Sequence, residues 1–77
     1  MSHTPNELVE MFPNKVDKIH DLKISDSAFA KLVDDYHAIN RTVHRGETDI
    51  EPMDDFRMEA LRKERLQLLD AIAAKLN

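Results

Sequence analysis

A chain of 77 residues is long enough for one small domain but too short to enclose a large pocket, which disfavours most enzyme classes. Its 34% charged side chains and single glycine favour long helices with solvated surfaces, and the absence of cysteine excludes disulfides and thiolate metal sites. The net charge of −4 argues against nucleic acid as the main partner. Because there is no run of about 18 apolar residues and no signal-peptide pattern, we expect a cytoplasmic protein that does not enter a membrane.

The first third of the chain predicts two short helices, over residues 5–12 and 14–24. Thr4 can cap the first helix, Pro5 suits its first turn, and Glu7 can reach back to complete a capping box. Both segments are too short to persist alone in water. We therefore expect them to dock on another part of the molecule.

A first long helix is predicted over residues 26–45, with Asp26 as its N-cap and Gly46 as a left-handed terminator. Apolar side chains recur along it at alternating steps of three and four residues, which keeps them on one face for a partner helix. These seam residues are Phe29, Leu32, Tyr36, Ile39 and Val43.

A short acidic loop over residues 46–51 follows, and Pro52 fits the first turn of a second long helix over residues 52–76. A connection this short makes the two long helices antiparallel neighbours. The sequence therefore predicts a single all-α domain over residues 1–77, a coiled-coil-like antiparallel hairpin preceded by short helical turns. The acidic loop is either a docking patch or a solubilising tip.

The last helix carries two apolar stripes, although one is enough to face the seam. The stripe assigned to the hairpin consists of Met58, Leu61, Leu68 and Ile72. The surplus stripe consists of Leu66, Leu69, Ala73 and Leu76. Either the N-terminal segments fold back over this second stripe, or another chain covers it.

Two segments resemble the YdcH-like family of small bacterial proteins, a domain of unknown function. The resemblance is carried by Phe29-Ala30-Lys31-Leu32, by Tyr36-His37-Ala38-Ile39-Asn40, and by Leu61-Arg62-Lys63-Glu64-Arg65-Leu66-Gln67-Leu68 with Asp70 and Ile72. It extends over about residues 12–76 and implies a helical hairpin without assigned catalytic residues. Leu69 stands where the family usually has a lysine, which makes the second stripe more apolar here.

No residue pattern predicts a metal ion or another cofactor. His37 and His44 lie two helical turns, about 10.5 Å, apart and cannot share an ion without further donors. Asp34 and His37 are close enough to do so, but spacing supplies no third ligand. We therefore expect solvated histidines.

The carboxylates Asp34 and Asp35 do not form a catalytic pair, because adjacent helical residues point about 100° apart. Pairing of Asp34 with Arg41, or of Lys31 with Asp35, is the better interpretation. We therefore expect no catalysis and infer no small-molecule substrate. A metal-dependent enzyme is the weakest of the functional hypotheses.

Two further polar groups need partners. Tyr36 lies in the seam, and its hydroxyl requires a hydrogen bond if the ring is buried. Arg65 interrupts an apolar stripe, where its stem can pack while its guanidinium either reaches out of the stripe or pairs with Asp35 or Glu64.

The leading functional hypothesis is a small cytosolic interaction module that self-associates, as a homodimer for example. Its contact surface would be the surplus stripe of Leu66, Leu69, Ala73 and Leu76. The alternative is a nucleic-acid or ribonucleoprotein accessory using the basic start of the last helix. The basic residues there, Arg57, Arg62, Lys63 and Arg65, do not share one face and are interleaved with Glu59 and Glu64.

Overall fold

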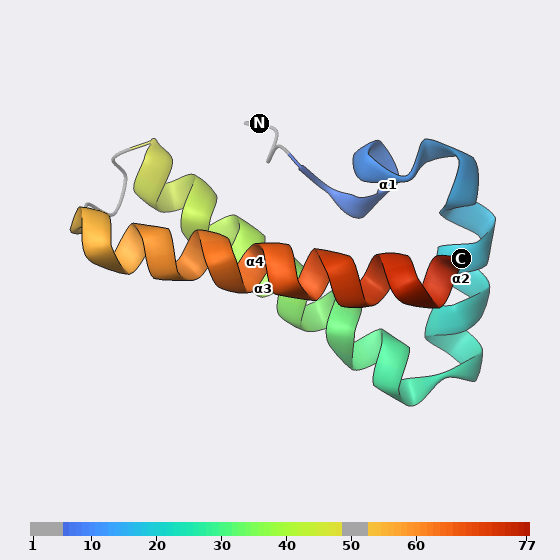
Figure 1. Ribbon diagram of the computed structural model, residues 1–77. Helices are drawn as coiled ribbons and strands as arrows, with labels where there is room; N and C mark the ends of the chain where they lie inside the picture. Colours follow the sequence, from blue (N-terminus) through green and yellow to red (C-terminus); the bar gives the residue numbers. More distant parts are fainter. Residues whose placement is uncertain (1–5, 49–52) are drawn as a thin grey trace.

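The computed structural model describes residues 6–48 and 53–77 of the chain, and the described residues form helices and turns without strands. The elements are α1 (Leu8–Met11), the 3-10 turn η1 (Pro13–Lys15), α2 (Val16–Ser25), α3 (Ser27–Glu47) and α4 (Asp55–Leu76). Helices α3 and α4 lie side by side and antiparallel (Figure 1). The all-α hairpin is therefore confirmed.

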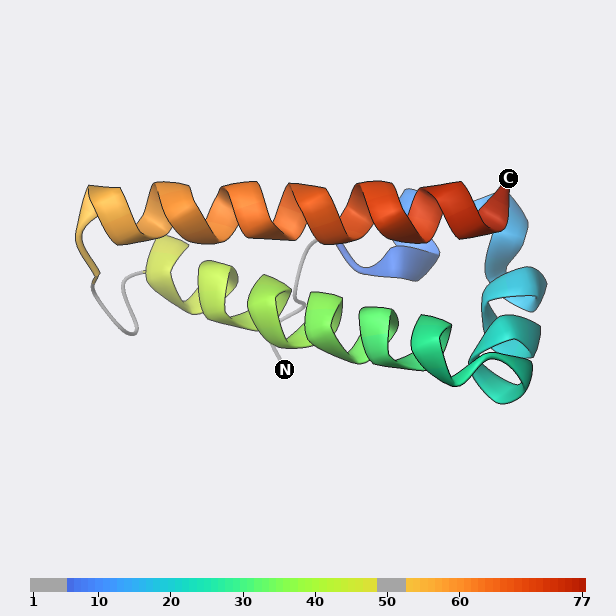
Figure 2. The same cartoon turned by 60° about the horizontal axis from the view of Figure 1, so that its bottom comes forward.

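The N-terminal elements complete the fold by packing against one end of the hairpin. Helix α2 crosses the end where α3 begins and α4 finishes, and α1 turns back alongside the hairpin (Figures 1 and 2). Two lysines of this segment also contact the end of α4, because Lys15 Nζ and Lys18 Nζ donate to the Leu76 carbonyl oxygen over 3.3 and 2.8 Å. Cations are favoured at a helix C-terminus, where carbonyl groups lack intrahelical partners.

The hydrophobic core joins the hairpin to the N-terminal elements. Its fully buried members come from all four α-helices: Leu8, Ile19, Phe29, Val33, Tyr36, Ile72 and Leu76. Since Leu8 and Ile19 are 2% and 6% exposed, the short helices are part of the core. Their burial supplies the stability that they lack in isolation.

The N-cap predicted for the first long helix is confirmed. The Asp26 carboxylate accepts hydrogen bonds from the Ala28 and Phe29 backbone N–H groups over 3.0 and 3.2 Å. Before the second long helix, Asp54 caps α4 by accepting a hydrogen bond from the Arg57 N–H over 2.7 Å. Helix α4 therefore begins at Asp55 and not at residue 52 as predicted.

Gly46 does not end α3 in the left-handed conformation that the sequence predicted. Its φ is not positive, and the helix continues to Glu47 before Thr48 caps it. A Cβ at this glycine would lie 2.9 Å from Met58 Cε and 3.1 Å from Met53 Cε. The glycine thus leaves room for the ends of the Met53 and Met58 side chains against the backbone of α3.

Some predicted features fall outside the described residues. These are the Thr4 cap and Pro5 of the first short helix, and residues 49–52, which include most of the acidic loop and Pro52.

Acidification is expected to reduce wild-type stability more than that of an Asp26→Asn variant. The Phe29 N–H bond is the main cause that lowers the pKa of Asp26, assisted by Lys75 and the Ala28 N–H and opposed by partial burial. A carboxyl group with a lowered folded-state pKa contributes stability above its unfolded pKa of about 3.9 and loses it as the pH falls through the folded value. Asparagine keeps a capping oxygen but does not titrate. Urea unfolding should show that the difference in free energy of unfolding between the wild type and the variant is smaller below pH 4 than at neutral pH. If the free energies of both proteins fell in parallel with pH, this role of Asp26 would be contradicted.

Candidate interaction surfaces

The residues of the predicted hairpin seam are buried or half-buried, but the buried face of α3 is rotated relative to the predicted one. Phe29, Tyr36 and Val43 are buried on α3, and Met58 and Ile72 are buried on α4. The remaining predicted members are half-buried: Leu32, Ile39, Leu61 and Leu68.

Two buried residues of α3 were not predicted from the sequence. Val33 and Asn40 are each 1% exposed, so the buried face of α3 steps through positions 29, 33, 36, 40 and 43. This spacing also alternates between four and three residues. It faces α2 as well as α4, which explains the rotation by one residue.

The surplus stripe of α4 is largely covered by the chain's own N-terminal elements. Leu76 is 1% exposed within the core, Leu69 packs against that core, and Ala73 is half-buried. Only Leu66 remains open, at 57% exposure. The first alternative, in which the N-terminal segments fold back, is the one the structure adopts, so Leu76 is not available as a free partner surface and Leu69 is only partly exposed.

Tyr36 is 1% exposed, and its hydroxyl donates to the Asn6 carbonyl oxygen over 2.6 Å. Burial raises the pKa of Tyr36, the Arg65 charge opposes this, and the Glu7 charge adds to it. Asn6 itself has a φ of 62°, a left-handed conformation that asparagine tolerates. The hydroxyl therefore ties the start of the N-terminal segment to the middle of α3.

Tyr36→Phe is expected to lower the free energy of unfolding by about 0.5–1.5 kcal/mol, the usual net contribution of a hydrogen bond. The ring stays in place, so the effect isolates the bond to Asn6. Amide exchange should accelerate in α1 more than in the middle of α3, because α1 follows the lost anchor. Equal acceleration in both helices would contradict a local anchoring role.

Three of the four basic residues singled out on α4 make intramolecular contacts. Arg65 donates to Asn40 Oδ1 over 3.1 Å, so its predicted pairing with Asp35 or Glu64 is wrong. Arg62 pairs with Glu47 over 3.1 Å, and Lys63 lies 3.6 Å from Glu59. These contacts favour structural roles over a phosphate-binding face.

Of the charge pairs predicted on α3, Lys31 with Asp35 is confirmed at 3.0 Å. His37 is half-buried, with its Nδ1 2.9 Å from Glu7 Oε2. Within residues 6–48 and 53–77, no group of three or more histidine or acidic side chains is arranged to hold a metal ion.

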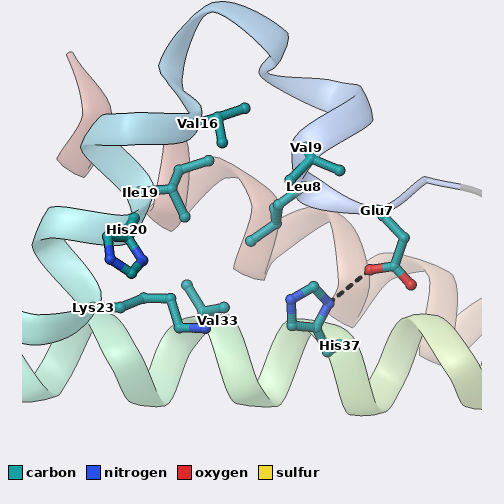
Figure 3. A pocket seen from close by; sticks show the side chains of 9 residues that line it. All are labelled: Glu7, Leu8, Val9, Val16, Ile19, His20, Lys23, Val33 and His37. Carbon is teal, nitrogen blue, oxygen red and sulfur yellow. Dashed lines mark ion pairs between the residues drawn. The ribbon is translucent and has the colours of Figure 1, made fainter.

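An open groove of about 310 Å³ lies between α1, α2 and α3 (Figure 3). Its lining is mainly aliphatic: Leu8, Val9, Val16, Ile19 and Val33. Polar groups stand at its rim, with His20 and Lys23 on α2 and the Glu7–His37 pair at the opposite side (Figure 3). Residues separated widely in sequence build this groove, and no spacing rule in the sequence identified it.

The most exposed large apolar side chain among the described residues is Phe56, at 86% exposure near the start of α4. Two carboxylates precede it, and Asp54 is the helix cap whereas Asp55 is exposed. The sequence does hold a signal for this residue. At 100° per residue, Phe56 lies opposite the buried side of α4, which Ile72 and Leu76 define.

Comparisons with known proteins give a family but no activity. No helix in the described part of the chain has the length and apolar character needed to cross a membrane. Neither the curated proteins nor the solved structures contain a significant match. A family model matches residues 29–76, which include most of α3 and all of α4 and make up more than half of the chain. The chain belongs to this family, which is described as a protein of unknown function (DUF465).

Proposed function

We propose that the chain is a small cytosolic interaction module that self-associates and has no catalytic chemistry of its own. The observation that carries this proposal is Phe56, a large aromatic side chain left 86% exposed on a well-formed helix. Covering a phenylalanine contributes about 1.5–3 kcal/mol. A second copy that covers Phe56 would gain this free energy at a site that the monomer leaves open.

Several features support interaction over catalysis. The floor of the groove is aliphatic, and two of the polar residues at its rim, Glu7 and His37, already pair with each other. Arg62 and Arg65 of α4 contact an acidic and an amide side chain of the same chain. The resemblance to YdcH-like proteins fits the proposal, since it concerns a helical hairpin without assigned catalytic residues.

Sedimentation equilibrium tests this proposal directly. With rising concentration, the average mass of the wild type should increase above the 8.9 kDa of one chain. The Phe56→Ala variant should stay closer to the monomer mass with an unchanged melting temperature, because the ring contacts little within its own chain. Leu69→Lys is a poorer probe, since Leu69 packs against the core. A wild type that remains monomeric at every concentration would refute self-association.

A further inference from the structure

We propose that the groove between α1, α2 and α3 receives Phe56 of a second copy of this chain, with Asp55 of that copy facing Lys23. The inference rests on the proposed self-association and specifies the two surfaces that meet. It replaces the surplus stripe of α4 as the contact surface.

The groove is a suitable apolar binding site for a phenylalanine ring. Leu8, Ile19 and Val33 form its floor, and Val9 and Val16 extend it toward solvent, where they are 55% and 42% exposed (Figure 3). Its volume of about 310 Å³ is at the lower end of the range for small-molecule sites. An aromatic side chain is therefore a better match than an extended segment or a bulky cofactor.

The charge at the rim is uneven. Glu7 is engaged with His37 at the α1 side, whereas the α2 side presents His20 and Lys23. In Figure 3 the Lys23 side chain extends from α2 into the view of the groove, with its nitrogen on the side of His37. Among the described residues, Lys23 has no carboxylate partner within ion-pairing distance.

The other surface has the complementary chemistry. Phe56 supplies an exposed ring, and Asp55 supplies an adjacent carboxylate that has no basic partner in the described structure. Asp54 is occupied as the helix cap, so Asp55 is the acidic group free to meet an ammonium. A ring entering the aliphatic floor would bring this carboxylate to the basic rim. The contact thus combines apolar burial with charge complementarity.

One chain cannot make this contact with itself. The start of α4 and helix α2 lie at opposite ends of the hairpin (Figures 1 and 2), in a molecule 37 Å long. The ring of one copy must therefore enter the groove of another. Two copies that exchange this contact would form a closed pair, the commonest symmetry of protein oligomers.

Sedimentation equilibrium on full-length variants tests the contact by charge exchange. Because a closed pair contains the contact twice, Phe56→Ala should raise the dissociation constant about a hundred- to ten-thousandfold, as loss of two buried aromatic side chains implies. Lys23→Glu and Asp55→Lys should each weaken association, because each places like charges together. The double variant Lys23→Glu/Asp55→Lys should recover association, since the pair is restored with its signs reversed.

The design contains its own controls. Ile24→Ala removes an apolar side chain that is 74% exposed on α2 but does not line the groove, and it should associate like the wild type. Asp55→Lys also disturbs the start of α4 through the helix dipole, but the double variant carries the same disturbance, so recovery would isolate the charge pair. Circular dichroism melts establish that every variant remains folded.

The outcomes separate the inference from the proposed function. A wild type that associates while Phe56→Ala and both charge reversals leave the dissociation constant unchanged would overturn this contact and leave self-association standing. Charge reversals that weaken association without recovery in the double variant would also overturn the Asp55–Lys23 pairing. A wild type that never associates would overturn both proposals.

Discussion

Phe29→Ala is expected to lower the free energy of unfolding by about 3–5 kcal/mol, the usual cost of removing a buried phenylalanine. Phe29 has no exposed surface and lies in the core that joins the hairpin to the N-terminal elements. A chain of this length has a total stability of about 4–12 kcal/mol at the usual value per residue. The substitution should therefore remove a large share of the stability, and urea unfolding followed by circular dichroism should show a much lower midpoint.

The chain supplies a matched control for this prediction. Phe56→Ala makes the same chemical change at a site that is 86% exposed, so the unfolding midpoint at low protein concentration should barely move. If the two variants lost similar stability, the assignment of Phe29 to the core and Phe56 to the surface would be wrong.

Leu8→Ala is expected to cost about 2–5 kcal/mol, although Leu8 belongs to a helix of only four residues. Its side chain is 2% exposed and contributes to the same core as Ile72 and Leu76. Removing it leaves a cavity beneath α1 and weakens the cover over the end of α4. Urea unfolding measures the change, and amide exchange should show that α1 opens first.

The neighbouring residue provides the comparison. Val9 is 55% exposed, so Val9→Ala should change the free energy of unfolding much less than Leu8→Ala. Equal, small effects would mean that the N-terminal segment does not stabilise the hairpin. The surplus stripe of α4 would then need another cover.

Much of the helical architecture could be predicted from local sequence signals. The Asp26 cap and the apolar spacing between Phe29 and Val43 indicate a helix of the observed position, because both signals act within one helix. The end of that helix was harder to predict. Glycine is the residue type that usually ends a helix, but Gly46 serves to make room for the Met58 side chain. That contact exists only in the packed structure.

The division of apolar residues among partners could not be predicted from periodicity. A stripe at helical spacing shows which side chains share a face, but it does not identify the element that covers them. Leu76 therefore looked available to a partner, whereas the folded N-terminal segment buries it. Val33 and Asn40 were missed for the same reason, because α3 faces two neighbours at once.

The groove could not be predicted from the sequence, for a different reason. Leu8, Ile19 and Val33 come from three helices, and their proximity arises only when these helices pack. Phe56 was within reach, since its position on α4 opposes the buried stripes. An exposed aromatic residue identified in this way indicates a contact surface. The groove that binds it can be found only from the tertiary structure.

An intermolecular nuclear Overhauser experiment can detect the contact between Phe56 of one copy and the groove of another. A sample mixed from isotopically labelled and unlabelled chains reports only contacts between copies, and the valine methyl groups of the groove are suitable probes. We expect cross-peaks between the Phe56 ring protons of one copy and the methyl groups of Val9, Val16 and Val33 of another. Intermolecular cross-peaks that join other surfaces while these methyl groups show none would contradict it.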